Sequence, residues 1–208
     1  MDESAIITKA KEFTSLFLDE EFNLSVPQLV ASGWNFVPIY ESIVPLQAEW
    51  ISNAIITVTK SSTVLAIDIE YKAEPRALEI EANRDNLLKF LFDSTGYVIF
   101  TNSGHDFLYY KDQLNRFSVI CGSLEFLTLA YPSSIDSMKV MFEYYWLDDP
   151  TLSDHEKDFY KHVWEKYSNF FHTEFIFNNN LKALDFLLSP QQIVSLTGLD
   201  RIARSNSV

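Results

Sequence analysis

The 208-residue chain carries 29 Asp and Glu against 16 Lys and Arg, giving a formal net charge of -13. Such a field repels phosphate backbones, which disfavours nucleic-acid binding, and it favours association with a basic partner. The composition, 47% hydrophobic and 15% aromatic, excludes a largely disordered chain.

Cysteine content and hydropathy indicate the cellular compartment of the protein. Cys121 is the only cysteine, so no disulfide can form within the chain, which suits a reducing compartment. No run approaches the roughly 18 apolar residues of a membrane span, and the N-terminus lacks the pattern of a signal peptide. We therefore expect a cytoplasmic protein without a membrane segment.

Hydrophobic periodicity predicts an α+β fold: a twisted, mainly antiparallel sheet of about six strands with flanking helices. Helices are expected at residues 3–20, 26–32, 83–94, 123–131, 133–146, 153 to about 171, and again from 189. Strands are expected at 34–40, 54–59, 63–71, 77–81, 97–101, 107–110 and 116–120. Residues 45–53 fit either a helical turn or a loop, 54–59 and 63–71 read as a hairpin, and Gly96 is expected to end the 83–94 helix.

A polar break at residues 147–150 is the best domain boundary. It divides the chain into an α+β domain, residues 1–147, and a helical C-terminal extension, residues 148–208, packed on the same domain. Ser153 and Glu156 form a capping box at the start of the first helix of the extension. Three asparagines at 178–180 predict a loop before its second helix.

Carboxylates alternate with apolar residues in two neighbouring predicted strands, 63–71 and 77–81. If the strands pair, four carboxylates are expected on one solvated sheet face, where they either keep the protein soluble or meet a basic partner. Two more carboxylates follow in or beside later turns. The predicted contact surface consists of Asp68, Glu70, Glu79, Glu81, Asp106 and Asp112.

Candidates for catalysis are weak, and we expect no enzyme, no metal and no cofactor. His105 lies in a turn, and Cys121 ends an apolar strand, where a lone cysteine is typically a small buried hydrophobe. His155 and His162 are seven residues apart on a helix, too far for one zinc ion. A hydrolase using His105 or Cys121 remains the alternative from the enzyme class.

One segment has a recognisable order of elements. Residues 96–131 read as strand, turn, strand, turn, strand and helix, with Gly104 and Asp106 in the first turn. Leu108 and Tyr109 follow in the second strand, and residues 123–127, Ser-Leu-Glu-Phe-Leu, open the helix. This segment, about a third of the chain, resembles the C-terminal half of the SUKH superfamily, and the pair at 33–34, Gly-Trp, resembles an early position of that family.

The resemblance implies a non-enzymatic immunity protein that binds one cognate toxin and covers or distorts its active site. Two parts depart from the family pattern: the middle of the chain is longer, and the helical tail after Pro150 has no counterpart in a minimal domain. We therefore expect an immunity or antitoxin-like protein that neutralises a basic protein toxin by direct binding. The alternative is an adaptor or structural subunit that docks through its aromatic-rich tail.

Overall fold

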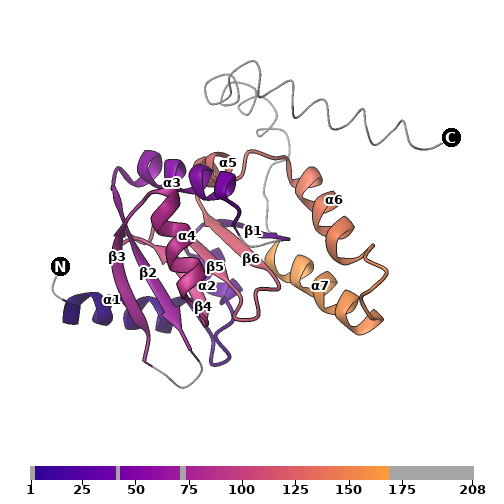
Figure 1. Cartoon of the computed structure of the whole chain (residues 1–208), viewed down its shortest axis with the longest axis horizontal. Coiled ribbons are helices and arrows are strands. Elements are labelled where there is room, and N and C mark those ends of the chain that lie inside the picture. Colours follow the sequence, from indigo (N-terminus) through magenta and orange to yellow (C-terminus); the bar gives the residue numbers. More distant parts are fainter. Residues whose placement is uncertain (1–2, 41–42, 71–73, 169–208) are drawn as a thin grey trace, which may run out of the picture. The chain divides into compact units, whose positions relative to one another are not determined.

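The computed structural model describes residues 3–40, 43–70 and 74–168. Their strands form one antiparallel sheet of six, in the spatial order β1-β6-β5-β4-β2-β3 (Figure 1). The strands are β1 (Asn35–Ile39), β2 (Thr63–Ile69), β3 (Arg76–Glu81), β4 (Tyr97–Thr101), β5 (Phe107–Lys111) and β6 (Ser118–Gly122). The predicted α+β class with a mainly antiparallel sheet is confirmed.

Helices cover both faces of this sheet, so the described part has three layers. The helices are α1 (Glu3–Phe17), α2 (Val26–Ala31), α3 (Pro45–Thr59), α4 (Arg84–Asp93), α5 (Leu124–Ala130), α6 (Ile135–Trp146) and α7 (Asp154–Tyr167). One core lies between the sheet and α3, α4 and α5, and a second lies between the sheet and α1, α2 and α7. Helix α6 contributes to both, with Met138 in the first core and Phe142 in the second. We call the two sides of the sheet the α4 face and the α1 face.

Strand alternation explains why both faces are apolar. In β2, Val64 and Ala66 point to the α4 face while Leu65 and Ile67 point to the α1 face, and all four are buried. The central strands β4, β5 and β6 therefore read as continuous apolar runs, as strands buried on both faces do. Each fully buried aromatic or aliphatic side chain contributes about 1.5–3 kcal/mol of transfer free energy.

The largest error of the sequence reading lies at residues 45–59. The predicted strand at 54–59 is wrong, because these residues form the second half of the helix α3. Its buried positions, which include Ala48, Ile51 and Ile55, recur at intervals of three and four, so one helical face packs against the α4-face core. Lys60, in the left-handed conformation at φ 56°, then ends the helix.

Gly96 also has a different role from the predicted one. Helix α4 ends at Asp93 with an extended Ser94, and Gly96 is followed directly by β4. A side chain at Gly96 would overlap the backbone of Ile69 and approach the Asp68 carboxylate, so glycine is required by close packing against β2.

The chain after the predicted boundary begins by packing on the sheet. The capping box of Ser153 and Glu156 is present, and it opens α7 as expected. Tyr160, Val163 and Tyr167 of α7 are buried in the α1-face core. The predicted end of this helix near residue 171, the loop at 178–180 and the helix from 189 lie outside the described residues, so the boundary at 147 stays a prediction.

Candidate functional site

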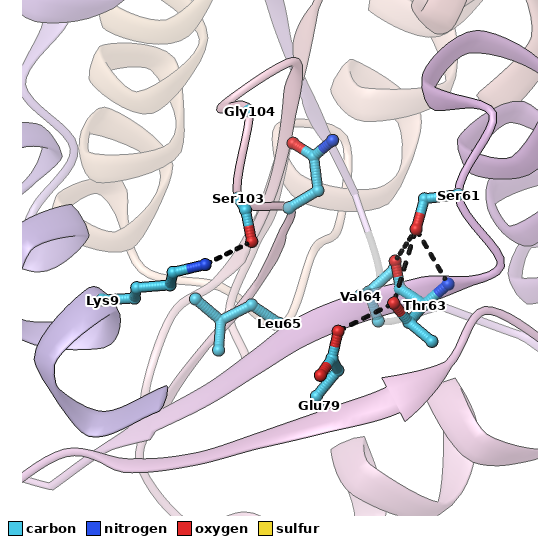
Figure 2. A pocket seen from close by; sticks show the side chains of 9 residues that line it. Lys9, Ser61, Thr63, Val64, Leu65, Glu79, Ser103 and Gly104 are labelled. Carbon is cyan, nitrogen blue, oxygen red and sulfur yellow. Dashed lines mark hydrogen bonds between the residues drawn. The ribbon is translucent and has the colours of Figure 1, made fainter. Parts of the chain in front are cut away.

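A pocket of about 170 Å³, lined by both polar and apolar side chains, lies at the end of the sheet where β2 begins and β3 ends (Figure 2). Four parts of the chain line it: α1, the segment from the α3–β2 turn into β2, the strand β3, and the turn between β4 and β5. The lining residues are Lys9, Ser61, Thr63, Val64, Leu65, Glu79, Asn102, Ser103 and Gly104. We call it the turn pocket.

Internal hydrogen bonds hold the polar groups of the turn pocket in place. Lys9 Nζ donates to Ser103 Oγ at 3.0 Å, and Thr63 Oγ1 donates to Glu79 Oε1 at 3.0 Å. The backbone N–H of Thr63 donates to Ser61 Oγ at 3.1 Å (Figure 2). The pocket thus combines an ammonium group from α1, a carboxylate from β3 and several hydroxyl groups, an arrangement suited to holding polar groups of a ligand or partner.

The β4–β5 turn beside this pocket is organised by Asp106. Its backbone N–H donates to Asn102 Oδ1 at 2.9 Å, and Asn102 Nδ2 donates to Asp106 Oδ2 at 2.7 Å. A Cβ atom at Gly104 would lie 2.7 Å from that carboxylate, so a larger residue there would require the Asp106 side chain to shift. His105 adopts φ 53°, and its ring packs edge-on against Phe13. Asp106 therefore has a structural role in the turn.

The prediction that four carboxylates share one sheet face is wrong. The register pairs Thr63 with Glu81 and Leu65 with Glu79, so both glutamates lie on the α1 face. Asp68 pairs with Arg76 and lies on the opposite, α4 face, toward which the same alternation directs Glu70. The strands pair as expected, but the register places the two carboxylates in and just after β2 and the two of β3 on opposite faces of the sheet.

Asp68 is buried and has partners inside the protein. Its carboxylate accepts from the backbone N–H of Gly96 at 3.1 Å and lies 3.4 Å from Arg76 Nη2. Glu70 is exposed and accepts from the Thr95 hydroxyl at 2.6 Å.

Asp112 is likewise buried, at the start of the β5–β6 turn, where it binds Arg116. Both buried aspartates interact electrostatically with the ammonium group of Lys111, a residue that is only 6% exposed. Burial lowers the pKa of Lys111, while Asp112 and Asp68 raise it. The two aspartates thus favour a buried cation, so both have a structural role inside the protein.

The other two strand carboxylates, Glu79 and Glu81, are exposed at the same end of the sheet. Glu79 lines the turn pocket, and Glu81 lines a second, wider hollow of about 450 Å³. That hollow also contains Glu49 from α3 and Asp85 from α4. We call Glu49, Glu79, Glu81 and Asp85 the acidic end.

Among the described residues that line the two hollows, Arg84 and Lys9 are cationic, and both form hydrogen bonds. Arg84 Nε donates to Asp85 Oδ1 at 2.8 Å, which raises the pKa of the guanidinium, with a smaller contribution from Glu49. Lys9 binds Ser103, as described above. The acidic end therefore keeps an excess of carboxylates at one end of the sheet.

Sequence reasoning found only part of this region. No sequence pattern indicated that Lys9 and Ser61 lie beside Glu79, because they are distant from it along the chain and only the folding of the sheet and α1 brings the three together. Asn102 and Ser103 lay in a recognised turn, but nothing in the sequence placed that turn beside β3.

The two residues considered for catalysis are packed among apolar side chains. Cys121 is fully buried in the α1-face core, and this burial raises the pKa of its thiol well above the ordinary value. Within the part of the chain that the structure describes, no hydrogen bond joins it to His105. No group of three or more His, Cys, Asp or Glu side chains in that part is arranged to hold a metal ion.

Comparison with models of protein families, with curated proteins and with solved structures gave no match to this chain. Across residues 3–40, 43–70 and 74–168, none of the helices combines the length and the apolar character needed to cross a membrane.

Proposed function

We propose that this protein is a cytoplasmic immunity or antitoxin-like protein that neutralises a basic protein toxin by binding it directly. The observation that carries the proposal is the acidic end, where Glu49, Glu81 and Asp85 line one hollow and Glu79 lies beside it. Carboxylates grouped on an exposed surface attract a cationic protein surface and orient its approach.

The overall charge supports the same proposal. A net charge of -13 accelerates encounter with a basic protein at low ionic strength, from a basal rate constant of about 10⁵–10⁶ M⁻¹s⁻¹ toward about 10⁸ M⁻¹s⁻¹. A toxin inhibitor benefits from this rate, because it must bind before the toxin reaches its target.

The choice of a toxin as the partner is supported by the resemblance of residues 96–131 to the SUKH superfamily. These residues contain β4, β5, β6 and α5, in the order of elements that the resemblance implies. Ser123 caps α5 by accepting the backbone N–H of Phe126 at 3.1 Å, which matches a helix that begins with serine.

The first experiment is affinity purification of the tagged protein from its native host, with mass spectrometry of the proteins that co-purify. We expect one basic partner at near-equal amount that is toxic when it is expressed alone and harmless when it is co-expressed with this chain. A partner that is not toxic, or no partner at any salt concentration, would contradict the proposal.

The second experiment tests the acidic end with the isolated partner. Glu79→Lys combined with Glu81→Lys is compared with Asp158→Lys combined with Glu165→Lys, two exposed positions on α7. Both variants change the net charge equally, so a difference between them reports the local surface. We expect the first variant to slow association about tenfold or more and to flatten its salt dependence, with a clearly smaller effect for the control. Equal rate constants for the two variants would assign the effect to net charge alone.

A further inference from the structure

The two edges of the sheet differ in how they are protected. At one edge, β1 is buried from Phe36 to Ile39, packs against α7 and contains Pro38, which has no N–H to donate. At the other edge β3 is the last strand; α1 packs against its α1 face, where Ala77 is buried, but four of the six β3 residues are exposed and no strand pairs with its outer side among the described residues. Figure 1 shows β3 as the outermost strand at this edge. An open strand edge is a template on which another strand can pair.

The alternation of hydrogen-bonded residue pairs between β2 and β3 shows which backbone groups of β3 point outward. The N–H of Ala82 donates to the carbonyl of Ser62 at 2.8 Å, and these two residues are opposite each other when the β2–β3 register is extended by one position. In an antiparallel pair, hydrogen-bonded and non-hydrogen-bonded residue pairs alternate. The even-numbered residues of β3 therefore bond to β2, and Ala77, Glu79 and Glu81 direct their N–H groups away from it. The carbonyl of Glu81 already accepts the N–H of Asn83 at 2.9 Å, so at this residue the N–H is the group offered to an added strand.

The side chains along this edge differ between the two faces. Glu79 and Glu81 are exposed on the α1 face. On the α4 face, Leu78 is 47% exposed and Ile80 is half-buried against the core. A strand added to this edge would thus meet carboxylates on one face and an apolar strip on the other.

We propose that β3 accepts an extended segment of the basic partner as a seventh strand, in which basic and apolar residues alternate. Residues of that segment opposite Glu79 and Glu81 share their face and are basic. The intervening residues lie beside Leu78 and are apolar. This inference rests on the proposed function only for the basic character of the partner; the mode of docking comes from the strand edge.

Charge selects this occupant over a second copy of the chain. A two-fold pairing of β3 centred on Glu79 would place Glu79 opposite its own copy, and like charges directly opposite destabilise a sheet. Two chains of net charge -13 also repel each other during approach.

The test uses a capped peptide of about eight residues that alternates Lys and Val, long enough to span the six-residue strand. A peptide of the same composition with all Lys before all Val is the comparison. Binding is measured by fluorescence anisotropy, and hydrogen exchange of single amides is measured by NMR. We expect tighter binding of the alternating peptide, with slowed exchange at the Ala77 and Glu81 amides.

A matched pair of variants separates the backbone from the charge. Glu81→Ala and Glu81→Pro both remove the carboxylate, but only the proline variant removes the outward N–H and leaves the bonds to β2 intact. We expect Glu81→Pro to bind the alternating peptide about tenfold more weakly than Glu81→Ala. Equal affinities of the two variants, or slowed exchange elsewhere in the chain, would overturn strand docking.

Other outcomes separate this inference from the proposed function. Equal affinity for the two peptides, weakened equally by Glu81→Ala and Glu81→Pro, would mean that the acidic end binds cations without adding a strand. That result would overturn the inference and leave the proposed function standing, because the latter fails only when the host purification yields no basic toxin. If Glu81→Pro does not fold, exchange at the Ala77 and Glu81 amides of the unaltered protein decides the question.

Discussion

Replacing Asp112 by Asn should destabilise the protein, although this residue looked like a surface carboxylate in the sequence. The side chain is 4% exposed and begins the β5–β6 turn. Its Oδ2 atom accepts from the backbone N–H groups of Leu114, at 3.2 Å, and Arg116, at 3.4 Å. Arg116 also donates from Nε at 2.8 Å and from Nη2 at 3.1 Å, and its guanidinium lies 4.4 Å from the Phe159 ring.

The magnitude follows from these four hydrogen bonds. Hydrogen bonds to a charged group contribute about 1.5–3 kcal/mol each, and an amide in place of the carboxylate weakens all four and turns one of them into a contact between two donors. Arg116 is 38% exposed, so water compensates part of the loss on its side. We expect a decrease of about 2–3 kcal/mol in the free energy of unfolding, which lowers Tm by about 5–10 °C in a unit of this size.

Urea unfolding followed by circular dichroism measures this decrease. Asp158→Asn is the matched control, because Asp158 is exposed on α7 and makes no side-chain hydrogen bond or ion pair with any residue that the structure describes. The control should remain within about 0.5 kcal/mol of the unaltered protein. If Asp112→Asn is equally mild, the turn does not depend on this carboxylate and our assignment of its role is wrong.

Two further predictions concern the core. Gly96→Ala should lower the free energy of unfolding by about 2–4 kcal/mol, because a Cβ atom there would overlap the Ile69 backbone and lie 2.6 Å from Asp68 Oδ1. Urea unfolding measures the change, and a variant as stable as the unaltered protein would contradict the close approach of Gly96 to β2. Burial raises the pKa of the Cys121 thiol in the folded protein above its value in the unfolded chain, about 8.5. The neutral thiol therefore contributes its full share of the folding free energy below about pH 8.5, and this contribution decreases as the pH rises from there toward the pKa of the folded state. Stability should therefore fall more steeply between about pH 8 and 10 in the unaltered protein than in Cys121→Ala, and parallel profiles would refute this.

Local signals in the chain were sufficient for most elements. The capping box of Ser153 and Glu156 predicts α7, and the continuous apolar runs on either side of the Ser103-Gly104 turn predict β4 and β5. These signals involve residues within one turn of helix or one hairpin, so no distant contact is needed to read them.

Helix α3 shows where local preference was overridden. Residues 54–59, Ala-Ile-Ile-Thr-Val-Thr, have a strand-like composition, yet they continue a helix that begins at Pro45. The preference of β-branched residues for strands is worth less than about 1 kcal/mol per residue. Burying Ile51, Ala54 and Ile55 together against the α4-face core outweighs it.

The candidate site depended even more on the tertiary structure. The sequence established that Glu79 and Glu81 share one face of a strand, because the side-chain period of a strand is two. It could not establish the register with β2, which moves Asp68 to the opposite face, since one residue of offset reverses every side chain.

Composition, helix caps, strand alternation and the acidic balance were thus determined by the sequence alone, because each depends on residues close together in the chain. Only the tertiary structure decided which strand became the open edge and which aspartates were buried beside Lys111. It also decided which carboxylates met in one hollow. These features depend on pairing between distant segments, whose energies come from packing that no local pattern encodes.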